Sequence, residues 1–162
     1  MNAVLVVELF VLLVVANGAP VLGKRLLGAT GARPVDGGAR FVDGRPLFGA
    51  AKTWRGILLS IAATTLVASA LGLSAAAGAI IGVGAMAGDL FSSFVKRRLG
   101  RPVSSRALGL DQIPEALAPL LAVAPMVPLG LLEILMTTAG FCVGSLALSR
   151  LMFDLRVREQ PF

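Results

Sequence analysis

The chain alternates long apolar runs with polar segments rich in basic residues. Because about 20 apolar residues in a helix cross about 30 Å of hydrocarbon, runs of this length predict membrane-spanning helices. The expected spans are residues 3–22, 57–73, 76–95, 113–128 and 131–149. The pattern therefore predicts an all-α integral membrane protein, a bundle of five transmembrane helices that forms one domain over residues 1–162.

Two polar loops, residues 23–55 and 96–112, separate the spans, and neither is long enough to fold alone. The third span contains Gly78-x-x-x-Gly82 and Gly84-x-x-x-Gly88, which let neighbouring backbones approach closely. We therefore expect this helix at the centre of the bundle. The fourth run carries several prolines and should be short and kinked.

The positive charges predict how the chain is oriented. All fifteen Lys and Arg residues lie in residues 24–55, residues 96–106 and the tail from Arg150. The other two connections contain none, so the positive-inside rule places the two polar loops and the carboxyl terminus in the cytoplasm. The sequence thus predicts a multi-pass protein of the cell membrane with its amino terminus outside. Glu8 and Glu133 should then lie near the outer surface.

Composition supports a membrane protein and narrows its chemistry. Hydrophobic residues make up 56% of the chain and charged residues 15%, with a mean hydropathy of +0.86. Histidine is absent and the only cysteine, Cys142, lies in an apolar run. This excludes an intrachain disulfide, a zinc site built from His and Cys, and Ser–His or Cys–His catalysis. Acids, cations, hydroxyls and an oxygen-bound metal ion remain, and these suit phosphate chemistry.

The second polar loop is bounded by two carboxylates, Asp89 and Asp111, where adjacent spans meet the cytoplasm. If residues 78–97 are helical, Asp89 shares one face with Ser92 or Ser93 and with Lys96. Mg²⁺ at nucleotide sites takes one or two carboxylates plus phosphate oxygens, so the two acids could hold Mg²⁺. The basic residues between them would bind the phosphates: Lys96, Arg97, Arg98, Arg101 and Arg106. Alternatively, Asp89 pairs with Lys96 or Arg97 in a buried ion pair, and Asp111 caps the fourth helix.

The first polar loop combines Asp-Gly pairs with a basic end. Its candidate cofactor-binding residues are Asp36, Asp43, Arg45, Lys52, Thr53 and Arg55. Glycine lets backbone N–H groups approach a phosphate, and Lys and Arg supply the counter-charge. The loop is not a Walker A loop, because Ala50 and Ala51 separate Gly49 from Lys52 and no strand precedes it. Alternatively, it is an ordinary positive-inside loop that contacts anionic lipid headgroups.

These motifs resemble a known family. Gly-Asp-Leu-Phe-x-Ser-x-x-Lys-Arg, from Gly88 to Arg97, followed by Leu110-Asp111, resembles the signature of membrane CTP:phosphatidate cytidylyltransferases. Asp-Gly-Gly-x-Arg-Phe-x-Asp-Gly-Arg from Asp36 to Arg45, and Lys-Thr-Trp-Arg-Gly from Lys52 to Gly56, resemble the CDP-archaeol synthase branch more particularly. The three motifs occur in the same order, and the resemblance covers the whole chain.

The resemblance implies a five-span enzyme that uses Mg²⁺ to transfer CMP from CTP to an archaeal ether-lipid phosphate. It implies Asp89 and Asp111 as catalytic metal ligands and Lys96 as a third catalytic residue, with Lys96, Ser93 and Arg97 at the nucleotide phosphates. The implied partners are CTP, a lipid phosphate and the membrane, with no nucleic acid. A lipid phosphate is already ionised near neutral pH, so its attack on the α-phosphorus of CTP, which gives CDP-lipid and pyrophosphate, needs no general base.

The sequence departs from the family pattern at three places. Pro114, followed by Glu115, stands where the larger family usually has a second acid. Val103-Ser104-Ser105 replaces a Lys-Asp pair, and Gly49-Ala50-Ala51 stands where archaeal members tend to have Gly-Asp-Gly.

Two other functions are compatible with the sequence. One is a small multi-pass transporter or channel for an anionic solute, in which the same cations line a vestibule and Glu8 and Glu133 face the path. The other is a lipid-binding or assembly protein without catalytic activity.

Overall fold

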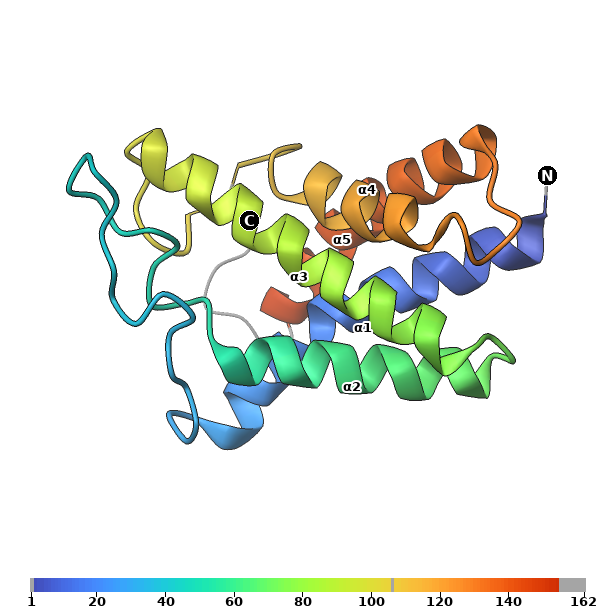
Figure 1. Ribbon diagram of the computed structural model, residues 1–162, viewed down its shortest axis with the longest axis horizontal. Coiled ribbons are helices and arrows are strands. Elements are labelled where there is room, and N and C mark those ends of the chain that lie inside the picture. The colour runs from blue at the N-terminus through green and yellow to red at the C-terminus, as the bar shows by residue number, and fades with distance from the viewer. Residues whose placement is uncertain (1, 106, 155–162) are drawn as a thin grey trace.

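A computed structural model describes residues 2–105 and 107–154, so Arg106 and the tail beyond Asp154 lie outside the described residues (Figure 1). The described chain forms five helices joined by irregular loops, which confirms the all-α prediction. In chain order they are α1 (Ala3–Leu27), α2 (Trp54–Ala70), α3 (Ala75–Arg98), α4 (Gln112–Val123) and α5 (Leu131–Asp154).

Three of these helices, α1, α3 and α5, are long and apolar enough to cross a membrane. The other two are shorter. α2 has 17 residues and α4 has 12, which correspond to about 25 Å and about 18 Å of helix. α4 ends at Val123 rather than near residue 128, because Pro125 and Pro128 cannot continue a helix and restrict the residues before them.

Side-chain caps start three of the helices. The Asn2 side chain accepts a hydrogen bond from Leu5 N, Thr53 caps α2 and Ser74 caps α3 in the same way. At its other end α1 continues past residue 22 to Leu27, where Gly28 adopts a positive φ of 53°. Lys24 and Arg25 thus lie in the last helical turn, where cations interact favourably with the helix dipole.

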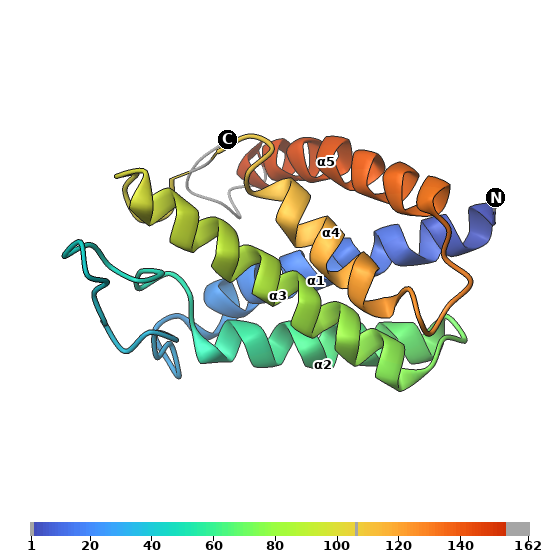
Figure 2. The same cartoon turned by 45° about the horizontal axis from the view of Figure 1, so that its top comes forward.

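The third helix lies between α2 and α4, as its glycines predict (Figures 1 and 2). Gly78 and Gly82 face α2, where an added Cβ would fall within 3 Å of backbone atoms of Thr65 and Ile61. Gly84 and Gly88 face α4, where a Cβ would collide with the backbone at Pro119 and Pro114. The two glycine pairs therefore serve two different neighbours, and they set how closely each helix approaches α3.

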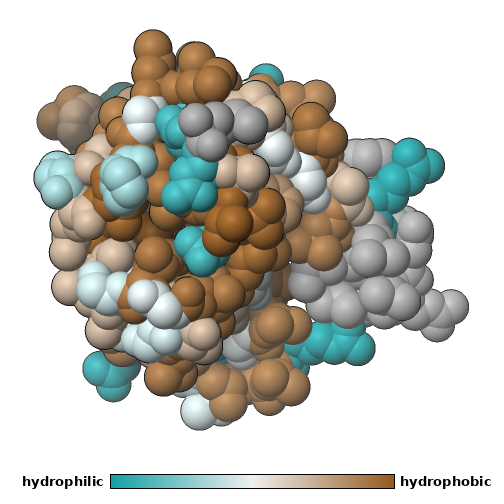
Figure 3. Space-filling model, turned by 90° about the vertical axis from the view of Figure 1, so that its right-hand side faces the viewer, coloured by the Kyte–Doolittle hydropathy of each residue, from teal (hydrophilic) through white to brown (hydrophobic). Residues whose placement is uncertain are grey.

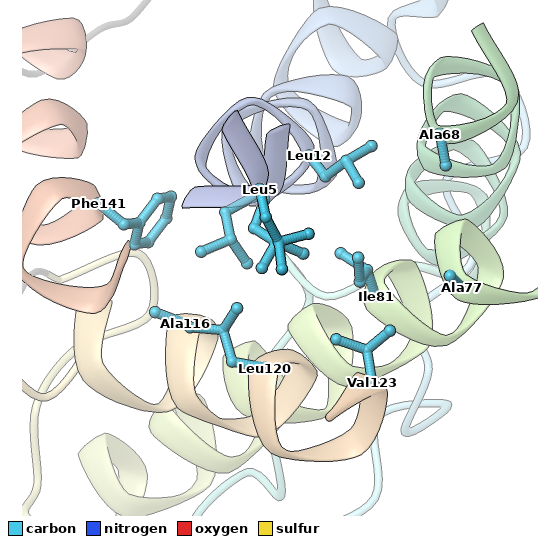
Figure 4. Packing of buried hydrophobic residues seen from close by; sticks show 11 residues of the cluster. Leu5, Leu12, Ala68, Ala77, Ile81, Ala116, Leu120, Val123 and Phe141 are labelled. Carbon is cyan, nitrogen blue, oxygen red and sulfur yellow. The ribbon is translucent and has the colours of Figure 1, made fainter. Parts of the chain in front are cut away.

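The bundle has an apolar end and a polar end. Leu5, Leu12, Ile81, Leu120 and Val123 belong to a buried core to which all five helices contribute (Figure 4). Both long loops lie together at the opposite end from the amino terminus and the two short connections (Figures 1 and 2). The end away from the loops presents a largely apolar surface (Figure 3). The packed core thus stabilises one end of the bundle. Side chains at the loop end do not belong to this core, so they are available to form a site.

Gly88→Ala tests the close approach of α3 and α4. Its Cβ would meet the Pro114 carbonyl, which is backbone and cannot rotate away, so the helices must separate. We expect a loss of about 1–3 kcal/mol in the free energy of unfolding, as is usual for overpacking. Gly18→Ala is the control, because a Cβ there meets nothing within 4 Å. Equal unfolding transitions for both variants in a denaturant titration would show that the α3–α4 contact is not tight.

Candidate active site

A cavity of about 1230 Å³ opens at the loop end of the bundle. Its wall includes parts of α1, α3, α4 and α5, the beginning of α2 and both long loops. Eight of the candidate residues line it: Lys52, Thr53, Arg55, Asp89, Ser93, Lys96, Arg97 and Asp111. The structure therefore brings together residues that are up to 59 positions apart in the sequence.

An ion pair connects the first loop to α3 in this cavity. Lys52 Nζ lies 2.6 Å from Asp89 Oδ1 and 2.7 Å from Asp89 Oδ2. The Lys52 backbone is fixed, because its carbonyl accepts a hydrogen bond from Val35 N and its N–H donates to Gly49 O. Burial alone would lower the pKa of Lys52, but the charge of Asp89 raises it above its ordinary value. Lys52 is therefore a cation at neutral pH.

A second ion pair joins α3 to the segment before α4. Lys96 Nζ lies 2.6 Å from Asp111 Oδ1 and donates to the Ser105 carbonyl at 2.8 Å. Asp111 Oδ2 accepts a hydrogen bond from Ala107 N at 2.8 Å. Asp111 is the N-cap residue directly before α4, but its side chain makes no capping bond to the helix. Asp89 and Asp111 are thus both ion-paired, although Asp89 pairs with Lys52 and not with Lys96 or Arg97.

Glu115 is a third carboxylate at this site, to which the sequence analysis gave no role. It lies on the first turn of α4, lines the cavity and is within hydrogen-bonding reach of Asp89, with Lys52 and Asp111 also close. The α3–α4 contact at Gly88 brings it there, since an added Cβ on Gly88 would fall 2.8 Å from Glu115 N. The acid that follows Pro114 therefore stands beside Asp89.

The remaining cavity residues have defined local partners. Ser93 and Arg97 are almost fully buried, at 3% exposure each, and Arg97 donates to the Pro102 carbonyl at 2.7 Å. Arg55 donates to the carbonyls of Gly28 and Thr30, so it ties the end of α1 to the start of α2. A carbonyl does not neutralise a guanidinium, so both arginines contribute positive charge to the cavity. Ser92 faces away, toward the Leu110 carbonyl.

Three candidate residues of the first loop, Asp36, Asp43 and Arg45, do not line the cavity. Arg45 donates to the carbonyls of Arg97 and Arg98 at the end of α3. Asp43 pairs with Arg98 at 3.1 Å. These contacts dock the loop onto the end of α3.

Asp36 organises the loop internally. Its carboxylate accepts hydrogen bonds from Gly38 N, Phe48 N and Gly49 N at 2.9–3.0 Å. Burial alone would raise the pKa of Asp36, but these N–H donors favour the ionised form and lower the pKa below its ordinary value. The loop segment that leads to Lys52 is thus held by a charged acceptor.

The described residues contain no group of three or more Asp, Glu, His or Cys residues arranged to bind a metal ion. Carboxylate pairs are present, however, since Asp89 adjoins Glu115 and both lie near Asp111. Glu133 is far from this site. It accepts hydrogen bonds from Asn2 N and Gly130 N at the opposite end of the bundle, and neither Glu133 nor Glu8 lines the cavity.

A protein-family model described as CarS-like, CDP-archaeol synthase, matches residues 1–162. The chain belongs to the CDP-archaeol synthase family. This confirms the resemblance drawn from the three motifs.

Individual relatives agree with the family match. A CDP-archaeol synthase from Pyrobaculum calidifontis is 33% identical over 169 residues, which cover 97% of this chain and 98% of the relative. One from Hyperthermus butylicus is 44% identical over 105 residues, but these cover only 60% of this chain and 59% of the relative. The chain thus spans about three fifths of the length of several curated relatives that it matches.

A solved structure described as "Structural insight into an intramembrane enzyme for archaeal membrane lipids biosynthesis" has a similar fold. It is 35% identical, with a TM-score of 0.73 over 88% of this chain and 90% of the other. Together with the apolar helices, this likeness identifies the chain as a multi-pass membrane member of the CDP-archaeol synthase family.

For this member of the CDP-archaeol synthase family, Asp36→Ala should loosen the first loop without unfolding the bundle. Hydrogen bonds to charged groups each contribute about 1.5–3 kcal/mol, so we expect the Phe48 and Gly49 amides to exchange with solvent at least about tenfold faster. Lowering the pH should likewise reduce the protection of these amides, measured relative to their intrinsic exchange rate at each pH. The pKa of Asp36 is lower in the folded protein than in the unfolded chain. The stabilisation by the Asp36 carboxylate is therefore complete above the unfolded-state pKa, and it disappears as the pH falls through the folded-state pKa.

Hydrogen exchange followed by mass spectrometry of the peptide that contains Phe48 and Gly49 measures this. Val42→Ala is the control, since the Val42 side chain is 94% exposed in the same loop. Unchanged exchange in Asp36→Ala would mean that the carboxylate does not hold the loop.

Proposed function

We propose that this protein is a CTP-dependent cytidylyltransferase that transfers CMP from CTP to a lipid phosphate, giving a CDP-archaeol-like CDP-lipid and pyrophosphate. The observation that carries the proposal is the polar cavity at the loop end of an apolar bundle, in which two Lys–Asp pairs and Glu115 come together. Membership of the CDP-archaeol synthase family supports the same function.

The charge of the cavity suits two anionic substrates. Cations outnumber acids among its described lining residues. The cations are Lys24, Arg25, Lys52, Arg55, Lys96 and Arg97, and the acids are Asp89, Asp111 and Glu115. A nucleoside triphosphate and a lipid phosphate repel each other, and clustered Lys and Arg offset that repulsion. We assign triphosphate binding to Lys52, Lys96 and Arg97, with Ser93 as an additional donor.

The acids fit a divalent metal ion, which we take to be Mg²⁺. Their oxygens are the hard donors that Mg²⁺ prefers, and Mg²⁺ at nucleotide sites needs only one or two carboxylates because phosphates supply the other ligands. Glu115 interacts with Asp89, and Asp111 is the third acid that lines the cavity. When bound, the ion would neutralise charge that develops on the phosphates during transfer.

In the reaction, an oxygen of the lipid phosphate forms a bond to the α-phosphorus of CTP. The bond from the α-phosphorus to the bridging oxygen breaks, and pyrophosphate leaves with the electron pair. Lys52, Lys96 and Arg97 would hold the triphosphate in line and offset the charge on the leaving group. The attacking oxygen is already ionised, so the lack of histidine is no obstacle. Positioning and charge supply the catalysis, as in phosphoryl transfer generally.

A lipid substrate can approach along the seam between α1 and α5. One face of α1 lines the polar cavity with Asn17, Gly18 and Val21. Toward the amino terminus the same face continues through Val14 to Phe10 and Val7. There it forms, with α5, an apolar groove of about 350 Å³. A phosphate in the cavity could therefore be followed by hydrocarbon chains along α1.

We further propose that the loop end faces the cytoplasm, where CTP is available, and that the amino terminus is outside. All described Lys and Arg residues lie at or near that end, and cytoplasmic loops carry such an excess. In this orientation residues 1–162 form one transmembrane domain. A transporter or channel is less well supported, because Glu8 and Glu133 lie away from the cavity.

The decisive assay measures pyrophosphate release and CDP-lipid mass after incubation of the purified protein with CTP, Mg²⁺ and single phosphates. The panel is an unsaturated isoprenoid glycerol-ether phosphate, a diacyl phosphatidate and water-soluble glycerol phosphate. We expect turnover with the ether lipid and little with glycerol phosphate, which lacks chains for the α1–α5 seam. Failure of every lipid phosphate to yield a CDP-lipid would contradict the proposed function.

The same assay tests the acids through Asp89→Asn and Glu115→Gln. Each change keeps the size of the side chain and replaces a carboxyl oxygen that could bind the metal ion with an amide nitrogen, so turnover per folded protein should fall about 100-fold or more. Glu8→Gln is the matched control, because it makes the same chemical change on α1 away from the cavity. Near-normal rates in both acid variants would remove Asp89 and Glu115 from the mechanism.

A further inference from the structure

The Lys52 ammonium binds both oxygens of Asp89, at 2.6 and 2.7 Å, and thus takes up the carboxylate that the proposed function assigns to the metal ion. A divalent cation on the same carboxylate would sit about 2.1 Å from one oxygen. Two cations cannot share these oxygens at such distances without strong repulsion. Lys52 and the metal ion are therefore competitors for Asp89.

Lys52 combines a fixed backbone with a flexible, partly exposed side chain. Its backbone is held by the hydrogen bonds to Val35 and Gly49, and Thr53 beside it begins α2. Its ammonium, in contrast, is a point charge at the end of a flexible four-carbon chain. Its side chain is 24% exposed and lines the cavity, so phosphate groups in the cavity could reach it.

The other lysine of the cavity differs in this respect. The Lys96 side chain is only 9% exposed, and its ammonium is held by the Ser105 carbonyl as well as by Asp111. Moving Lys96 would break two interactions and leave the partly buried Ser105 carbonyl without this donor. Lys52 is thus the cation that can leave its acid at lower cost.

We propose that Lys52 occupies Asp89 in competition with the divalent cation, and that the CTP phosphates relieve the competition by binding the Lys52 ammonium. This inference rests on the proposed function. Its consequence is coupled binding: metal ion and nucleotide favour each other, and free metal ion alone binds poorly. Coupling of this kind usually changes affinities by about 5–150-fold.

Mn²⁺ provides the test, because its unbound form is measured directly by electron paramagnetic resonance. The full-length protein is titrated with Mn²⁺ without nucleotide or lipid, so no turnover occurs. Lys52→Met removes the ammonium and keeps an apolar chain of similar length. It should bind Mn²⁺ on the order of tenfold more tightly than the unmodified protein. Lys52→Gln serves as a second variant if Lys52→Met does not fold.

Three further variants separate competition from a general charge effect. Lys24→Gln removes a cation from the same cavity for which the described residues show no ion pair, so Mn²⁺ affinity should change little. Lys52→Arg keeps a cation that can hold Asp89 and should bind Mn²⁺ no more tightly than the unmodified protein. The double variant Lys52→Met, Asp89→Asn should not bind Mn²⁺ more tightly, because the gain in Mn²⁺ affinity requires the Asp89 carboxylate.

The inference is overturned if Lys52→Met and Lys52→Gln bind Mn²⁺ no better than Lys24→Gln, or if the gain persists without Asp89. These outcomes are distinct from a failure of the proposed function. An unmodified protein that makes CDP-lipid, together with an unchanged Mn²⁺ affinity in the Lys52 variants, would reject only the competition. An unmodified protein that makes no CDP-lipid would reject the proposed function itself.

Discussion

The close approach of α3 and α4 is the contact on which the rest of the site depends. Gly84 and Gly88 leave no side chain between the two helices, so Asp89 and Glu115, one residue after Gly88 and Pro114 respectively, come side by side. Any larger residue at these glycines would separate the two carboxylates. In a bilayer, where apolar side chains gain little by leaving lipid, such small-residue contacts are a principal means of packing helices. The same contact that holds the bundle together therefore also builds the acidic part of the cavity.

Charge balance explains how so many ionisable groups are accommodated at the end of an apolar bundle. Asp89 and Asp111 each have a lysine partner at 2.6 Å, and the first loop is fastened to α3 through Arg45, Asp43 and Arg98. A buried charge without a partner would cost several kcal/mol, so each pair stabilises the fold only as long as both members remain. In the proposed mechanism, the CTP phosphates and the metal ion would replace one partner of such a pair with another.

The sequence predicted the helices and the polar end well, since apolar runs, glycine pairs and cations are local signals. It also identified the family from three motifs. The ion-pair partners of the charged residues were not predictable. Lys52 and Asp89 are 37 residues apart in the chain, and only the folding of the first loop brings them into contact. Likewise, Glu115 belongs to no sequence motif, and only the α3–α4 contact brings it to the site beside Asp89. A sequence motif made Asp36, Asp43 and Arg45 candidate site residues, yet their contacts lie within the loop and at the end of α3, where sequence alone could not place them.

A structure of the protein with CTP and Mn²⁺ bound, in which anomalous scattering locates the metal ion, tests most directly whether this cavity is the site of transfer. The triphosphate should lie in the cavity against Lys96 and Arg97, with Mn²⁺ on Asp89 and Lys52 Nζ moved from Asp89 to a phosphate oxygen. A triphosphate bound outside the cavity, or Mn²⁺ bound away from both Asp89 and Glu115, would contradict the assignment.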